Sequence, residues 1–108
     1  MSSSQTLRLR SEYFAAVWRG EKCSTIRAGK RLLRKGSLVL ESDNGCLTVQ
    51  VTDIKYKYFQ DLTDEDARLD GFADSQTLRK TLYSFYTNLR ERSIVTIIYF
   101  RLPDENNT

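Results

Sequence analysis

The chain has 108 residues, of which 40% are hydrophobic and 29% are charged, the balance of an ordinary globular protein. This length supports one small core, so we expect a single domain over residues 1–108. No apolar run approaches the roughly 18 residues that a membrane span needs, and residues 1–5 lack the basic-then-apolar pattern of a secretory signal. We therefore expect a cytoplasmic protein that does not contact a membrane.

The composition removes several kinds of active site. There is no histidine, which excludes histidine bases, histidine metal ligands and Ser–His or Cys–His nucleophilic pairs. The two cysteines, Cys23 and Cys46, are too far apart for a CxxC metal clamp, and in the cytosol we expect both to stay reduced. We expect no metal and no cofactor. Any catalysis must then use Lys, Arg, Asp, Glu, Ser, Thr, Tyr or Cys side chains.

The charges are unevenly distributed, although the net charge is only +3. Residues 1–36 contain nine basic and two acidic residues, whereas residues 61–78 contain six acidic residues and one arginine. A basic first third favours a polyanionic partner, most simply a phosphate backbone. Solvated loops and charged helix ends account for the same pattern, so charge alone leaves both interpretations open.

The first predicted element is a short helix with Ser11 as its N-cap. Phe14, Val17 and Trp18 recur at helical spacing and form one apolar stripe, so we expect Phe14 and Trp18 in the core rather than on a base-stacking surface. Gly20 suits the left-handed position just past the helix.

A strand over residues 23–27 follows, then a basic loop over 28–36 with Leu32 and Leu33 as its apolar anchor. Residues 37–41 read as a second strand, and Asp43-Asn44-Gly45 is a strong hairpin signal. The loop either steers phosphate groups or is an ordinary solvated loop. Its candidate phosphate-binding residues are Lys30, Arg31, Arg34 and Lys35.

The return strand of the hairpin alternates cleanly from Leu47 and extends to Phe59, long enough that we expect a bend or bulge. Near its end, Tyr56, Tyr58 and Phe59 interleave with lysines, a pattern that suits base stacking with phosphate contacts. A strand with one core face and one solvent face explains this pattern equally well.

Two helices and a strand complete the predicted order. Thr63 begins a short acidic helix that Asp70-Gly71 ends, and Asp74 or Ser75 caps the next helix. Residues 94–100 are nearly continuous apolar and β-branched, which predicts a central strand. Apolar residues recur at helical spacing in the second helix, at Leu78, Leu82, Phe85 and Leu89.

The tail from Pro103 to Thr108 is polar and we expect it to fray. The complete order of elements predicts a small α+β domain, most simply a compact barrel.

The segment Gly20 to Arg27 is the most informative for chemistry. If Thr25 lies on a strand, Cys23 and Arg27 share its face, and Lys22 lies at the turn before it. A threonine beside a desolvated lysine is one way to make a nucleophile without histidine, and Arg27 suits a forked contact with a phosphate or carbonyl oxygen. An ordinary solvated strand edge would show the same spacing.

The pattern Gly20-x-Lys22-x-x-Thr25-x-Arg27 after a short amphipathic helix resembles the signature of the ASCH domain family, small relatives of the PUA RNA-binding fold. The resemblance continues through Lys35-Gly36-Ser37-Leu38-Val39, Leu62-Thr63 and Asp70-Gly71-Phe72, and covers about residues 8–102. It implies a small PUA-like β-barrel with flanking short helices, and a cleft that faces RNA or a nucleoside.

Some small bacterial members of that family are amidohydrolases that remove the acetyl group of N4-acetylcytidine, using a threonine nucleophile, a lysine and a glutamate. The resemblance assigns the threonine's role to Thr25 and the lysine's role to Lys22. The glutamate's role falls on Asp70, whose side chain is shorter by one methylene. It also implies that Tyr86 lies near the cleft. A non-enzymatic RNA-binding module and, less favoured, a ribonuclease remain as alternatives.

Overall fold

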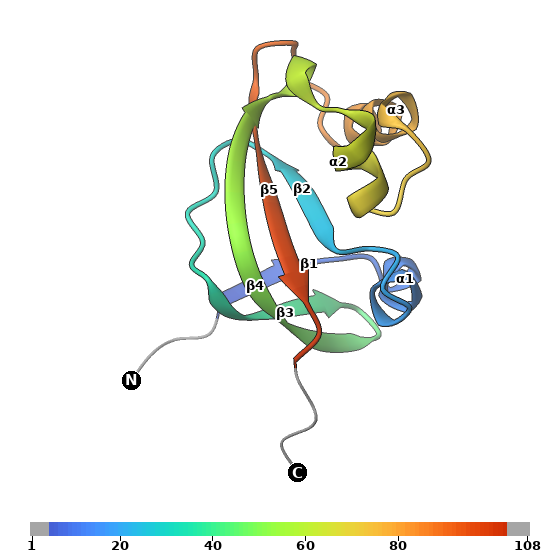
Figure 1. Ribbon diagram of the computed structural model, residues 1–108, viewed down its shortest axis with the longest axis vertical. Coiled ribbons are helices and arrows are strands. Elements are labelled where there is room, and N and C mark those ends of the chain that lie inside the picture. The colour runs from blue at the N-terminus through green and yellow to red at the C-terminus, as the bar shows by residue number, and fades with distance from the viewer. Residues whose placement is uncertain (1–4, 104–108) are drawn as a thin grey trace.

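The computed structural model describes residues 5–103, which fold into a curled five-stranded sheet with short helices on one side (Figure 1). The strand order is β1-β3-β4-β5-β2; β1 and β3 are parallel and the other neighbours are antiparallel. The strands are β1 (Gln5–Arg8), β2 (Ser24–Ala28), β3 (Gly36–Ser42), β4 (Gly45–Tyr58) and β5 (Ile94–Arg101). This is the predicted α+β class, with the sheet forming half a barrel.

The helices are short and lie mainly in two groups. The first group precedes β2 and the second lies between β4 and β5. They are η1 (Ser11–Tyr13) and α1 (Phe14–Trp18), then η2 (Phe59–Asp61), α2 (Asp64–Leu69) and α3 (Ser75–Phe85), where η denotes a 3-10 turn. Among residues 5–103, no helix is both long and apolar enough to cross a membrane.

Several local predictions are confirmed. The turn at residues 43–45 joins β3 to β4 as an antiparallel hairpin, and the register of β4 shifts between Val51 and Asp53, the irregularity expected in so long a strand. β5 lies between β4 and β2, so it is an inner strand. Of the predicted tail, all residues beyond Pro103 lie outside the described range.

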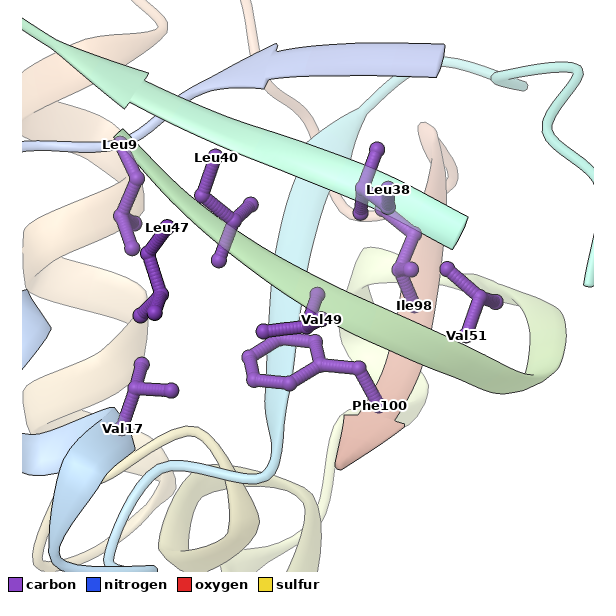
Figure 2. Packing of buried hydrophobic residues seen from close by; sticks show 9 residues of the cluster. All are labelled: Leu9, Val17, Leu38, Leu40, Leu47, Val49, Val51, Ile98 and Phe100. Carbon is purple, nitrogen blue, oxygen red and sulfur yellow. The ribbon is translucent and has the colours of Figure 1, made fainter. Parts of the chain in front are cut away.

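Two apolar clusters divide the core. The first lies among β3, β4 and the end of β5, and it also includes Val17 of α1 and Leu9 (Figure 2). The second packs Ile26 of β2 and Val95 and Ile97 of β5 against the helices, chiefly through Leu78 and Leu82 of α3. Because β5 contributes to both clusters from alternate residues, Ile98 to the first and Ile97 to the second, it needs the nearly continuous apolar sequence that predicted it.

Three side chains do not lie where the sequence predicted, and a fourth resolves an open alternative. Trp18 is 57% exposed, so its assignment to the core is wrong; α1 ends at that residue, and only Val17 of the helix is buried. Phe85 is 44% exposed at the end of α3, and Leu89 is buried from the loop beyond that helix. Phe59, for which the sequence left base stacking and core packing open, is fully buried in the second cluster and belongs to the core.

Two further differences concern the start of the chain. Residue Ser11 is the first residue of η1 rather than its cap, and its hydroxyl accepts a hydrogen bond from the Asn44 side chain at 3.2 Å. Strand β1 was not predicted, because its four residues pair only with β3, more than 30 positions away.

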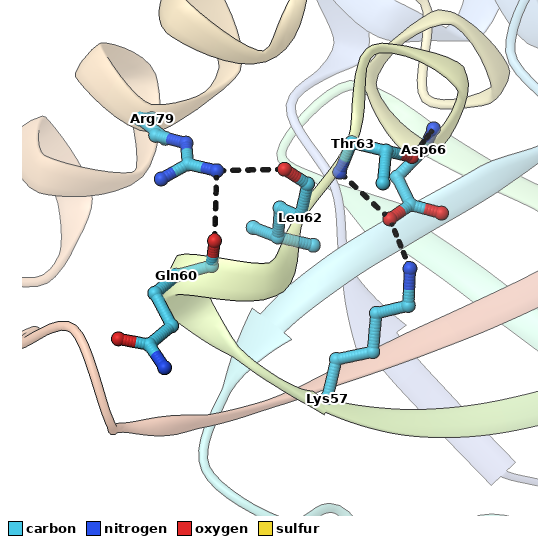
Figure 3. A network of polar contacts seen from close by, with 6 residues as sticks. All are labelled: Lys57, Gln60, Leu62, Thr63, Asp66 and Arg79. Carbon is cyan, nitrogen blue, oxygen red and sulfur yellow. Dashed lines mark hydrogen bonds and ion pairs between the residues drawn. The ribbon is translucent and has the colours of Figure 1, made fainter.

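A polar network fixes α2 against the sheet and against α3 (Figure 3). The Asp66 carboxylate accepts hydrogen bonds from Lys57 Nζ of β4 at 2.6 Å and from the Thr63 backbone N–H at 3.0 Å, while Thr63 caps the helix in return. The guanidinium of Arg79 in α3 donates to the backbone oxygen of Leu62 at 2.6 Å. These contacts hold α2 in place, and Asp70 directly follows this helix.

Candidate functional site

A cavity of about 470 Å³ opens beside β2, between η1 and α3. Because β2 is an edge strand of the sheet, the cavity receives side chains from the strand itself, from the helices and from the end of β1. The sequence predicts nine candidate catalytic or binding residues, counting the four basic residues of the loop over 28–36. Five of the nine line the cavity: Lys22, Thr25, Arg27, Asp70 and Tyr86.

Lys22 is buried, with only 5% of its surface exposed, at the turn before β2. Its amine contacts the carboxylate of Asp70 and donates to the Asp70 backbone oxygen at 3.2 Å. Gly71, directly after Asp70, has a φ of +91° that favours glycine, and a Cβ there would make only an ordinary contact with Lys22 Cβ at 3.6 Å. The turn is fixed by the Lys22 backbone N–H, which donates to Ala16 of α1 at 3.1 Å. A lysine and a carboxylate are thereby held together away from bulk water.

Asp70 follows the last residue of α2 and is as buried as Lys22. The end of this helix is tied to the segment before β2, because Cys23 donates from its backbone to Leu69 at 2.6 Å. Burial raises the pKa of Asp70 from its ordinary 3.8 to about 6, against the opposing effects of Lys22 and Arg27. Asp70 contacts the lysine and lines the cavity although its side chain is shorter than that of glutamate. Its raised pKa means that the carboxyl group loses its proton at about pH 6.

Thr25 and Arg27 lie on one face of β2, as their spacing predicted. Arg27 Nε lies 3.4 Å from the Thr25 hydroxyl oxygen, and a second guanidinium nitrogen donates to the backbone oxygen of Arg8, at the end of β1. Arg27 thus links β2 to β1, the two edges of the sheet. Burial lowers its pKa while Tyr86 favours the charged form, and a guanidinium stays protonated at neutral pH.

Tyr13 of η1 is a member of the site that the sequence did not identify. The Lys22 amine lies 5.3 Å from the centre of the Tyr13 ring, a cation–π distance, and the ring lines the cavity. Burial raises the pKa of the Tyr13 hydroxyl. No sequence pattern connects residue 13 with residue 22, since the contact depends on how the helix and the following turn fold back.

The four basic residues of the loop between β2 and β3 do not line the cavity. In Figure 1 this loop lies on the opposite side of the sheet from α2 and α3. Lys30, Arg34 and Lys35 are exposed and Arg31 is half-buried. Arg31 is nevertheless close enough to lower the pKa of Arg27 by repulsion, so the loop and the cavity are electrostatically connected.

The arrangement offers a definite set of chemical groups. Thr25 supplies a hydroxyl group, the Lys22–Asp70 pair can exchange a proton, and Arg27 supplies a fixed positive charge beside the hydroxyl. Within residues 5–103, no cluster of three or more Cys, Asp or Glu side chains is arranged to hold a metal ion.

Comparison with known proteins agrees with this architecture. The family model described as ASCH domain matches residues 2–102. An ASCH domain from Lactobacillus crispatus JV V101 superimposes with a TM-score of 0.66 at 16% identity, over 90% of this chain and 79% of that one. A protein from Enterococcus faecalis V583 gives 0.80 at 12% identity, over 96% and 78% of the two chains.

A mutant ASCH protein from Zymomonas mobilis superimposes with a TM-score of 0.64 at 14% identity, over 89% of this chain and 67% of that one. At such identities the structures share the fold alone, and no curated protein matches the sequence. The family model, by contrast, spans nearly the whole chain, including the segment from Gly20 to Arg27 and the carboxylate that meets it. The chain therefore belongs to the ASCH domain family.

Proposed function

We propose that this protein is an amidohydrolase that removes the acetyl group of N4-acetylcytidine, with Thr25 as the nucleophile. The observation that carries the proposal is the contact between the buried Lys22 amine and the Asp70 carboxylate, on the wall of the same cavity as the Thr25 hydroxyl. In a chain without histidine, this pair is the group best suited to move a proton beside a threonine.

The first step is attack on the acetyl carbonyl. When the shared proton resides on Asp70, Lys22 is a neutral amine and accepts the proton of the Thr25 hydroxyl as its oxygen bonds to the carbonyl carbon. Negative charge then develops on the former carbonyl oxygen. Arg27, already fixed beside the Thr25 hydroxyl and to the Arg8 backbone, stabilises that charge without having to reorganise.

The second step releases cytidine. The bond between the carbonyl carbon and N4 breaks, and the leaving nitrogen takes the proton that Lys22 received from Thr25, which leaves an acetyl ester on the threonine. Water then attacks the ester, acetate departs and the Thr25 hydroxyl regains its proton. One water is consumed, and one cytidine and one acetate are produced.

The size and lining of the cavity suit a nucleoside. A volume of about 470 Å³ falls within the usual range for small-molecule sites, roughly 300–1,000 Å³. Tyr13, Phe72 and Tyr86 contribute aromatic surface against which a planar base can pack. Thr25 and Arg27 of β2, together with Lys22 and Asp70, give the cavity one polar wall, and we expect the acetylated amine to enter toward that wall.

A direct test is incubation of the purified protein with N4-acetylcytidine, with cytidine and acetate measured separately. We expect the two products in equal amounts, and slower release from acetyl-lysine, whose flexible aliphatic chain lacks a base to pack against the rings. A folded protein that binds RNA but produces neither product would overturn the amidohydrolase and favour a recognition module. Cleavage of an RNA chain without acetate would favour a ribonuclease.

A further inference from the structure

The face of the sheet that carries Thr25 and Arg27 continues beyond the cavity to a second, exposed surface. Arg27 is paired with Thr96 of β5, and Thr96 with Tyr56 of β4, so these three side chains share one face. One step farther along the same face, Ile94 is paired with Tyr58. The face therefore runs from the cavity wall to two tyrosines that are 41% and 40% exposed.

The basic loop is fixed to this face rather than free in solvent. The Thr96 hydroxyl donates to the Gly29 backbone oxygen at 2.6 Å and accepts from the Arg31 backbone N–H at 2.8 Å. The Tyr56 hydroxyl donates to the Arg31 backbone oxygen at 2.9 Å. The two sequence features that suggested phosphate binding and base stacking, separated by 25 residues, are thus brought together on one surface.

Each tyrosine on this surface has a cation beside its ring. Lys30 Nζ lies 5.3 Å from the centre of the Tyr56 ring, and the guanidinium carbon of Arg92 lies 5.8 Å from that of Tyr58. Both cations come from neighbouring loops rather than from β4 itself. Aromatic rings next to cations match the alternation of bases and phosphates in a nucleic acid strand.

The surface is also strongly positive. Residues 29–35 contain four basic residues and no acidic one, and Arg92, which follows Glu91 in the sequence, adds a fifth positive charge. Tyr56 and Tyr58 are two residues apart on one strand, roughly 6.6 Å along it, so each ring can take its own base. An acidic peptide would meet the cations but leave both rings without a partner.

We propose that this surface, formed by residues 29–35, Tyr56, Tyr58, Arg92 and Ile94, binds single-stranded nucleic acid. Bases stack on the two tyrosines, and phosphates contact Lys30, Arg92 and the loop arginines. The surface adjoins the cavity, because Arg27 of the cavity wall is paired with Thr96, whose hydroxyl accepts a hydrogen bond from the Arg31 backbone N–H, so one strand can occupy both. The binding needs no hydrolysis and does not depend on the proposed activity.

The test is fluorescence anisotropy with a labelled, unmodified single-stranded RNA decamer at several salt concentrations. We expect Lys30→Glu and Arg92→Glu each to weaken binding and to reduce the slope of log K against log salt, by about one for each phosphate that the variant no longer neutralises. Tyr58→Ala should weaken binding roughly tenfold or more, because a base can no longer stack at that position. All three variants should hydrolyse free N4-acetylcytidine at the wild-type rate.

Lys55→Glu is the matched control. Lys55 is the neighbour of Tyr56 in β4 but lies on the other face, where its amine is 5.5 Å from the Tyr99 ring. This control makes the same change in net charge and should alter decamer affinity little. Equal losses in Lys55→Glu and Lys30→Glu, wild-type affinity in Tyr58→Ala, or equal competition by polyglutamate would each overturn the proposal. Decamer binding without hydrolysis would overturn only the amidohydrolase.

Discussion

The amine of Lys22 contacts the carboxylate of Asp70, 48 residues later in the chain, with both side chains about 95% removed from solvent. The contact joins the turn before β2 to the end of α2 and lies on the wall of the cavity. A buried pair of this kind is costly to break from one side, because the remaining charge has no partner. The pair therefore links the stability of the fold to the chemistry of the site.

A double-mutant cycle measures this link. We expect Asp70→Asn and Lys22→Met each to lower the free energy of unfolding by about 3–5 kcal/mol. The combined variant should lose clearly less than the sum of the two, since neither charge is then left alone. Urea denaturation of the four proteins gives the coupling energy. Strictly additive losses would mean that the two groups do not interact.

The rate of hydrolysis should depend on the ionisation of Asp70. Since burial raises the pKa of Asp70 to about 6, the carboxylate loses its proton near that pH and only then accepts one from Lys22. We expect kcat/KM for N4-acetylcytidine to rise with pH through an apparent pKa near 6 and then level off. In Asp70→Asn the residual activity should lack this limb. A limb that persists in Asp70→Asn would assign it to another group.

The same pKa gives a signed prediction for stability. Asp70 binds its proton more tightly in the folded protein than in the unfolded chain. The stabilisation that this tighter proton binding gives is therefore full below the ordinary pKa of aspartate and is lost as pH rises through about 6. The free energy of unfolding of the wild type relative to Asp70→Asn should therefore fall by a few kcal/mol at most between about pH 4 and about pH 7.

Asp74 provides a control of opposite sign. Hydrogen bonds from the backbone and side chain of Thr77 lower the pKa of Asp74, the N-cap of α3. Its contribution is present above its ordinary pKa and is lost as pH falls below that value. Asp74→Asn compared with the wild type should thus show its change at acid pH only. Profiles of the same sign for the two aspartates would contradict the account.

Gly71→Ala tests whether backbone strain beside the site disturbs the Lys22–Asp70 pair. At φ +91° an alanine is strained, although its Cβ would make only an ordinary contact with Lys22 Cβ, and the strain falls on the residue directly after Asp70. Gly29→Ala is the matched control, with φ +84° and no neighbouring atom within 4 Å. We expect both variants to lose about 1 kcal/mol of stability from strain, measured by thermal unfolding. Because Gly71 adjoins Asp70, only Gly71→Ala should also slow hydrolysis; equal rates in the two would show that the backbone at Gly71 does not help to position the Lys22–Asp70 pair.

Features with local causes were predictable from the sequence. The hairpin turn at residues 43–45, the capped start of α2 at Thr63 and the inner strand β5 all follow from a few adjacent residues, and all are confirmed. The shared face of Thr25 and Arg27 also follows from strand alternation alone, and the 3.4 Å contact between them agrees with it.

Features that depend on distant partners were not predictable in this way. Trp18 has the spacing of a core residue, but α1 is only five residues long and ends before that side chain can be covered. Tyr13 reaches Lys22 because the chain turns back after α1, and the basic loop meets Tyr56 because Thr96 of β5 fixes it there. In each case the cause lies in another element of the sheet or in the turn that brings it close.

The measurement that tests the central claim most directly is release of cytidine from N4-acetylcytidine by the wild type, Thr25→Ser and Thr25→Ala. Serine keeps a hydroxyl beside Arg27, in the cavity that Lys22 also lines, whereas alanine removes it. We predict partial activity in Thr25→Ser and a loss on the order of a thousandfold or more in Thr25→Ala, as expected when a nucleophile is removed. Wild-type turnover by a folded Thr25→Ala protein would contradict the account.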